Sequence, residues 1–196
     1  MKCDALRGFL PWVGLGLLVA ACGPKAAPVA PDPLDVRYGF RDIRFGQTPI
    51  QIQGIDPARP FLRDATAPDY VIHKRSNEEL RVRDVVLEDI RYTFFKNQLM
   101  EINLFWEPRS RPDPSAPPPL YHFLTNQFGP PDTQEMSLQR KEFRAIWEAN
   151  LVRLTLVESA PQGRVKGRGL ATLISKPLAA QRDAARGAAP RQKFGF

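Results

Sequence analysis

Apolar and polar residues alternate along most of the stretch from Leu87 to Trp106. A period of two is typical of strands that bury one face and expose the other. The polar residues Lys96-Asn97-Gln98 interrupt the alternation, so the stretch predicts a β-hairpin with a short turn. The side chains expected on its apolar face are Ile90, Tyr92, Phe94, Met100, Ile102, Leu104 and Trp106.

A different spacing follows the hairpin, at residues 120–128. Leu120, Phe123, Leu124 and Phe128 recur at helical intervals, prolines precede the first of them, and Gly129 with Pro130 follows the last. Prolines are tolerated in the first turn of a helix, whereas a glycine and a proline end it. The spacing therefore predicts one amphipathic helix that lies on the sheet.

Alternation returns after residue 140, with strands expected around Phe143 to Trp147, around Val152 to Leu156 and from Gly169 to Ser175. Two short strands are expected earlier, at residues 50–53 and 70–73. Strands in series around one helix are typical of an α+β domain. We expect an antiparallel β-sheet of about five or six strands with one amphipathic helix packed on it.

Prolines mark the boundaries of this domain, because 20 of the 196 residues are proline and they cluster. Residues 22–35 are rich in Pro and Ala and predict a tether, which places the α+β domain at residues 36–176. Residues 107–119 form a proline-rich loop, interpreted as an exposed insertion or as a polyproline ligand for a partner. Residues 177–196 are a basic Ala/Arg-rich tail, which could form a short helix but has little to bury and is expected to be mobile.

Residues 1–21 have the pattern of an export signal. Lys2 and Arg7 give a charged start, and an apolar run extends from Phe9 to Ala20 before small residues. The run is much shorter than the roughly 20 residues that a spanning helix needs. A signal peptide is therefore favoured over a permanent transmembrane anchor.

The signal ends in Val19-Ala20-Ala21-Cys22, which resembles the lipobox of bacterial lipoproteins. The resemblance implies that Cys22 receives a diacylglycerol, that the signal is cut before it, and that the new amino group is acylated. Two or three acyl chains hold a protein firmly at a membrane. The alternative is a simple signal peptide with a free cysteine near its cleavage site. Gly23 stands where some bacteria use Asp for inner-membrane retention, which favours the periplasmic face of the outer membrane.

A second resemblance is looser and concerns the domain itself. The residues Gly39-Phe40-Arg41, Ile43 and Phe45-Gly46, with Phe128-Gly129-Pro130-Pro131 later, resemble small uncharacterised bacterial envelope proteins with a Gly-Phe-Arg-Gly-Ile opening motif. Asp42 stands where that pattern has Gly. The resemblance implies an α+β lipoprotein-type domain and brings no activity with it.

The net charge of +7 is concentrated at the C-terminal end. Residues 162–196 hold eight basic residues and one acid, so the rest of the mature chain is close to neutral. Export separates the protein from nucleic acid, which we exclude as a partner. A basic end can attract anionic lipid or an acidic envelope polymer, or can serve only as a solvated tail.

One glycine-rich basic stretch, residues 163–169, is the candidate anion-binding site. In an extended chain Arg164, Lys166 and Arg168 would point to one side and could hold a phosphate or a carboxylate. The alternative is a hairpin turn made easy by its glycines.

Other chemistry-bearing residues are sparse. The two histidines, His73 and His122, have no nearby second ligand in the sequence, so no metal site is predicted. The acid pairs Glu78-Glu79 and Glu88-Asp89 could act in acid–base catalysis, although surface pairing with neighbouring arginines explains them better. No spacing predicts a catalytic site, and no cofactor is indicated.

These observations favour a lipid-anchored envelope protein that is not an enzyme and that binds or organises an envelope component. Its expected partners are the membrane, through acyl chains on Cys22, and an anionic envelope polymer or lipid, or an envelope protein. One alternative is an envelope hydrolase that combines His73 or His122 with an acid. Another is a structural subunit of an envelope assembly, which would present an apolar patch around Phe95 and Phe105.

Overall fold

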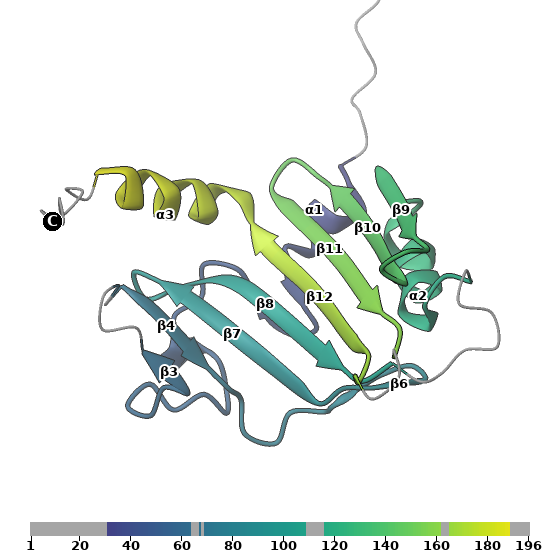
Figure 1. Ribbon diagram of the computed structural model, residues 1–196. Helices are drawn as coiled ribbons and strands as arrows, with labels where there is room; N and C mark the ends of the chain where they lie inside the picture. The colour runs from purple at the N-terminus through teal and green to yellow at the C-terminus, as the bar shows by residue number, and fades with distance from the viewer. Residues whose placement is uncertain (1–30, 64–66, 68, 109–115, 162–164, 189–196) are drawn as a thin grey trace, which may run out of the picture. The chain divides into compact units, whose positions relative to one another are not determined.

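The computed structural model describes residues 31–63, 67, 69–108, 116–161 and 165–188. The signal peptide, Cys22, most of the tether, part of the proline-rich loop and the last eight residues lie outside the described residues. The described chain forms an antiparallel sheet with a few helices, which confirms the α+β class (Figure 1). The sheet has eight strands rather than five or six, and three α-helices accompany it rather than one.

The strands of the large sheet lie in the order β3-β4-β7-β8-β12-β11-β10-β9. Two short ladders, β1 with β2 and β5 with β6, lie apart from it. The bounds of these strands are β1 Gly39–Phe40, β2 Ile43–Arg44, β3 Leu62–Arg63, β4 Tyr70–His73, β5 Arg81–Val82, β6 Val85–Val86, β7 Asp89–Phe95, β8 Gln98–Trp106, β9 Thr133–Ser137, β10 Glu142–Glu148, β11 Val152–Ser159 and β12 Arg168–Ser175. The helices are α1 Pro33–Arg37, the 3-10 helix η1 Pro49–Gln51, α2 Pro119–Phe128 and α3 Lys176–Ala188.

The predicted hairpin is β7 and β8, joined at Lys96 and Asn97. Both turn residues have positive φ, +47° and +65°, as a two-residue turn that follows the twist of the strands requires. A register shift between Thr93 and Phe94 adds one residue on the β8 side. Met100 is therefore not on the face of Ile102, as the alternation predicted, and packs in a separate cluster on the other side of the sheet.

Two further sequence predictions differ from the structure. Residues 50–53 are not a strand, because Pro49 begins the 3-10 helix η1 and Thr48 and Gln51 form a capping box around it. The strand β9 was missed because it is a mostly exposed edge strand, so its side chains show no apolar alternation. By contrast, β4 and α2 lie where the sequence placed them, with α2 ending at Gly129.

One face of the sheet carries the main core. Helix α2 packs there, where Tyr121 makes edge-to-face contacts with Phe143 and lies against Trp147 of β10. The N-terminal elements add Leu34, Ile43, Phe45, Ile52 and Ile55 to the same cluster.

Helix α3 covers the opposite face (Figure 1). The sequence suggested too little apolar surface in this segment to bury, but Leu178 is 6% exposed and packs with Phe95 and Met100. Phe105, farther along β8, is partly buried under the guanidinium group of Arg91, 4.5 Å from its ring centre. At the position of the apolar patch expected of a structural subunit, α3 therefore covers Phe95, and the guanidinium group of Arg91 lies over Phe105.

The folded region begins earlier than residue 36, within the expected tether. Leu34 of α1 is 1% exposed. The carboxylate of Asp35 accepts hydrogen bonds from the backbone N–H groups of Asn150, Leu151 and Val152 at 2.9, 2.8 and 3.1 Å. Helix α1 is thus attached to the turn between β10 and β11.

Candidate functional site

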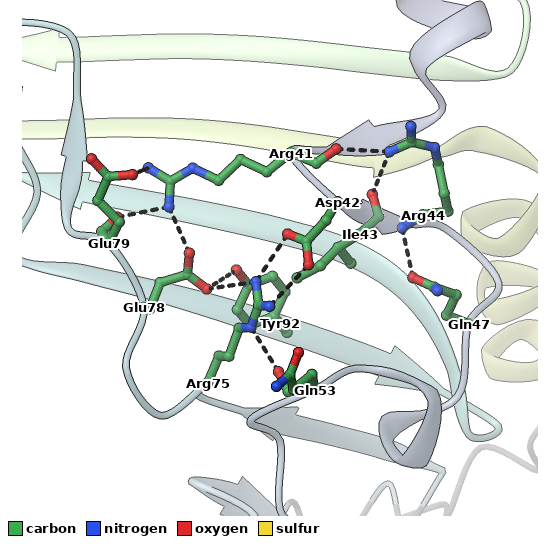
Figure 2. A network of polar contacts seen from close by, with 10 residues as sticks. All are labelled: Arg41, Asp42, Ile43, Arg44, Gln47, Gln53, Arg75, Glu78, Glu79 and Tyr92. Carbon is green, nitrogen blue, oxygen red and sulfur yellow. Dashed lines mark hydrogen bonds and ion pairs between the residues drawn. The ribbon is translucent and has the colours of Figure 1, made fainter.

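The Gly-Phe-Arg motif forms the small hairpin of β1 and β2. A Cβ atom at Gly39 would lie 2.0 Å from the carbonyl oxygen of Ile43, so only glycine allows the two strands to approach this closely. Arg41 occupies the turn with φ +56°, and its side chain extends away from the hairpin (Figure 2).

The guanidinium group of Arg41 joins this hairpin to the segment before and within β5. It donates to Oε1 of Glu78 at 2.6 Å and to the backbone carbonyl oxygen of Glu79 at 2.7 Å (Figure 2). It also donates to the backbone carbonyl oxygen of Arg81 at 2.7 Å. Arginine suits this position because its planar fork can satisfy several acceptors at once. Arg41 therefore fixes the position of β5 relative to β1.

Glu78 is the centre of the network, with a side chain only 7% exposed. Its other carboxylate oxygen accepts a hydrogen bond from the hydroxyl of Tyr92 at 2.6 Å and lies 3.7 Å from Arg75. The sequence suggested ordinary surface pairing for this acid. The pairing with arginine is present, but Glu78 lies inside the fold, where a charged group needs such partners.

Arg75 extends the network to the turn of the hairpin. It binds both carboxylate oxygens of Asp42, at 3.0 and 2.9 Å, and donates to the carbonyl oxygen of Gln53 at 2.7 Å (Figure 2). The hydrogen bond from Arg75 lowers the pKa of Asp42. Burial, with the contact to Glu78, raises the pKa of Tyr92 well above its usual value, so its hydroxyl remains a donor. Two members of this network, Arg41 and Glu79, line a cavity.

That cavity has a volume of about 290 Å³ and lies between α2, the short ladders and the main face of the sheet. Its interior is apolar and is contributed by β5, β8, β11, β12 and α2. The apolar side chains that line it are Phe40, Val82, Leu104, Leu120, Phe123, Leu124, Phe128, Leu154, Ala171 and Leu173. The Gly-Phe-Arg motif and Phe128, which stand far apart in the sequence, both contribute to it.

Four arginines and one glutamate also line this cavity: Arg37, Arg41, Arg81, Arg83 and Glu79. Three of the arginines stand over aromatic rings of the same lining. The guanidinium carbon of Arg37 lies 5.8 Å from the ring centre of Phe128, that of Arg41 4.9 Å from Phe40, and that of Arg83 5.7 Å from Phe123. Such cation–π contacts hold a guanidinium group beside an apolar surface.

The arginines differ in how far their N–H groups are used. Arg41 donates to three acceptors, as described above. Arg37, Arg81 and Arg83 are exposed, and within the described part of the chain their side chains have no carboxylate at ion-pair distance. The cavity is thus an apolar pocket with surplus positive charge beside it. The sequence analysis did not identify its three exposed arginines as a site, because nothing in their spacing showed that residues of α1 and of the β5–β6 ladder line the same cavity.

The candidate anion-binding residues of the sequence lie elsewhere. Arg164 is outside the described residues. Lys166 is exposed and forms an ion pair with Glu107 at 2.8 Å, which raises the pKa of the lysine. Arg168 is exposed at the start of β12. Lys166 therefore already has an anionic partner from the protein.

The two histidines lie in unlike surroundings. His122 is exposed on α2 and stands against Tyr121. His73 is 2% exposed, makes an edge-to-face contact with Phe94, and has no hydrogen-bond partner for Nδ1 among the described residues. Its burial lowers its pKa. It lines a hollow of about 280 Å³ with the charged residues Arg63, Asp69 and Lys96. This hollow and the apolar cavity have different lining residues.

Searches for similar proteins add no identity to this description. No protein-family model matches the chain, no curated protein matches it, and no solved structure matches it. Among the described residues, no helix has the length and apolar character needed to cross a membrane, and no group of three or more His, Cys, Asp or Glu side chains is placed to hold a metal ion.

Proposed function

We propose that this protein is a lipid-anchored, non-enzymatic binding protein of the bacterial envelope. The observation that carries the proposal is the cavity of about 290 Å³ under α2, in which a small apolar ligand would be held. Ligand sites are commonly concave, apolar and lined by a few placed polar groups, as this cavity is. Anchoring through Cys22 would keep the domain and its ligand beside a membrane surface.

The chemistry of the lining favours binding over hydrolysis. Its 17 residues include one carboxylate, that of Glu79, and neither histidine nor a serine, threonine or cysteine. Hydrolysis by a side-chain nucleophile needs such a group with a base beside it. The buried His73 lines a different hollow, so it brings no base to the apolar cavity.

Two positions on α2 provide a matched test of ligand binding. Gln127 lines the cavity, whereas its neighbour Asn126 is exposed and does not. We expect a neutral fluorescent probe such as N-phenyl-1-naphthylamine to bind the full chain carrying Cys22→Ser. Gln127→Trp should abolish that binding because a large side chain at a lining position takes up space in the cavity, and Asn126→Trp should retain it. Absence of probe binding to the parent chain, or equal loss in both variants, would contradict the proposal.

The proposed anchor is tested separately. Wild type expressed in a lipoprotein-competent bacterium should begin at Cys22, carry acyl mass and leave the membrane only with detergent. The Cys22→Ser chain should lack that mass and should not remain with the membrane. Two soluble chains cut at another site would show that the lipobox interpretation is wrong.

A further inference from the structure

We infer that the ligand of the apolar cavity is a single-chain amphiphile with an anionic head, its chain inside the cavity and its carboxylate or phosphate held by Arg37, Arg81 and Arg83. This inference rests on the proposed binding function and specifies its ligand class.

The first argument is charge. Four arginines and one glutamate line the cavity, an excess of three positive charges. Glu79 is drawn toward Arg41, 4.0 Å away, and its side chain is 76% exposed. Arg37, Arg81 and Arg83 have no such partner within the described residues. Like charges gathered at one opening raise the local potential, which an anionic group would lower.

The second argument is the contact of the guanidinium groups with aromatic rings. A guanidinium held beside a ring by a cation–π contact can still bind the two oxygens of a carboxylate or phosphate through its N–H groups. The guanidinium carbon of Arg37 lies 5.8 Å from the ring centre of Phe128, and that of Arg83 lies 5.7 Å from Phe123. Arg41 makes the same kind of contact with Phe40, and its N–H groups donate to Glu78 and two backbone carbonyls. Within one lining, Arg41 is thus satisfied by acceptors from the protein, whereas Arg37 and Arg83 have no carboxylate at ion-pair distance among the residues that the structure describes.

The third argument is size. A methylene group needs about as much space as a water molecule in the liquid, about 30 Å³. A cavity of about 290 Å³ therefore holds one chain of about ten carbons, and the two long chains of a phospholipid would not fit. A fatty acid and a singly acylated phospholipid share the required chemistry, an anionic head on one chain.

The experiment compares four ligands that share a ten-carbon chain and differ in the head: decanoate, decyl phosphate, 1-decanol and decyltrimethylammonium. Each ligand is titrated into the full chain carrying Cys22→Ser with the neutral probe bound, and displacement of the probe is measured. Every ligand is kept below the concentration at which that ligand forms micelles. We expect at least one of the two anions to displace the probe at a tenth or less of the decanol concentration. The cation should be the weakest. The order of decanoate and decyl phosphate shows which head group is preferred.

The double variant Arg37→Gln, Arg83→Gln tests the residues. It should raise the concentration of the preferred anion needed for displacement by about tenfold and leave that of decanol unchanged. Both side chains are exposed, so the fold should survive, and unchanged circular dichroism checks this. Arg59→Gln is the matched control, because Arg59 is a highly exposed arginine outside the cavity lining. It should leave all four ligands unaffected.

The outcomes separate the two proposals. If the probe and decanol bind but neither anion binds more tightly, the anionic head is refuted while an apolar binding site stands. If the double variant binds the anions as well as wild type does, the assignment of the head group to Arg37 and Arg83 is refuted. If the probe itself does not bind, the proposed function fails first.

Discussion

Replacing Gly169 with alanine should destabilise the protein strongly, because Trp106 lies across this position. Trp106, Gly169 and Glu158 are direct neighbours on β8, β12 and β11. The indole Nε1 reaches over the glycine and donates to Oε2 of Glu158 at 2.8 Å. Trp106 and Glu158 are 4% and 2% exposed, so the bond is buried.

The magnitude follows from the missing space. A Cβ at Gly169 would lie 1.9 Å from Cε2 and 2.2 Å from Nε1 of Trp106, so the ring must move. Overpacking of a core costs about 1–3 kcal/mol. Movement of the ring also weakens a buried hydrogen bond, and leaving a buried polar group without its partner costs about 1–3 kcal/mol. We expect a loss of about 3 kcal/mol in the free energy of unfolding, a large part of the roughly 5–15 kcal/mol typical of a domain.

Urea unfolding followed by far-ultraviolet circular dichroism measures this loss. Gly187→Ala is the matched control, because Gly187 lies in α3 and a Cβ there would meet no atom within 4 Å. It should be neutral or stabilise by up to about 1 kcal/mol. In a Trp106→Leu background the cost of Gly169→Ala should fall below about 1 kcal/mol, since the obstructing ring is gone. A Gly169→Ala chain within about 0.5 kcal/mol of wild type would refute the reasoning.

Two more predictions concern the polar side chains of Asp35 and His73. Asp35→Ala removes the acceptor for three N–H groups of the β10–β11 turn. It should therefore lower the free energy of unfolding by about 1–2 kcal/mol and speed hydrogen exchange at Leu151. Asp35→Asn keeps an acceptor, so its stability should lie between those of wild type and Asp35→Ala. Unchanged exchange would contradict the attachment of α1. Burial lowers the pKa of His73 from 6.5, so the unfolded chain binds a proton first as pH falls, and stability should decrease below about pH 6.5. His73→Phe should remove this slope between pH 5 and 6.5, and an equal slope in both chains would contradict its origin.

The local pattern of apolar and polar residues predicted the elements that are amphipathic, with one apolar and one polar face. The alternation of residues 87–106 identified the β7–β8 hairpin, and the helical spacing of residues 120–128 identified α2. Edge strands such as β9 were not predicted because they bury little on either face. The packing of helix α3 was not predicted because it depends on the contact of Leu178 with Phe95 and Met100, which are distant from it in the sequence.

The candidate site was mostly beyond the reach of the sequence. Arg37, Arg41 and Arg83 belong to three separate segments, and contacts between distant residues, such as Asp35 with the β10–β11 turn and Arg41 with Glu78, bring them to one cavity. The basic stretch that the sequence favoured has Lys166 paired with Glu107. The spacing of basic residues in the sequence does not predict where positive charge remains available, because the anionic partners that neutralise a cation come from distant segments, as Glu107 does for Lys166.

The sequence by itself determined the α+β class, the inward faces of β7, β10, β11 and most of β8, and the expectation of an anchored, exported chain, because polarity patterns and the N-terminal motif are local. The tertiary structure decided which side of the sheet Met100 occupies, why residue 169 must be glycine, and where an apolar hollow meets arginines that have no carboxylate partner among the described residues. These depend on a one-residue bulge, on three strands in register and on segments joined by a partly buried ion pair. Such properties arise from contacts between distant residues, which exist only once the chain is folded.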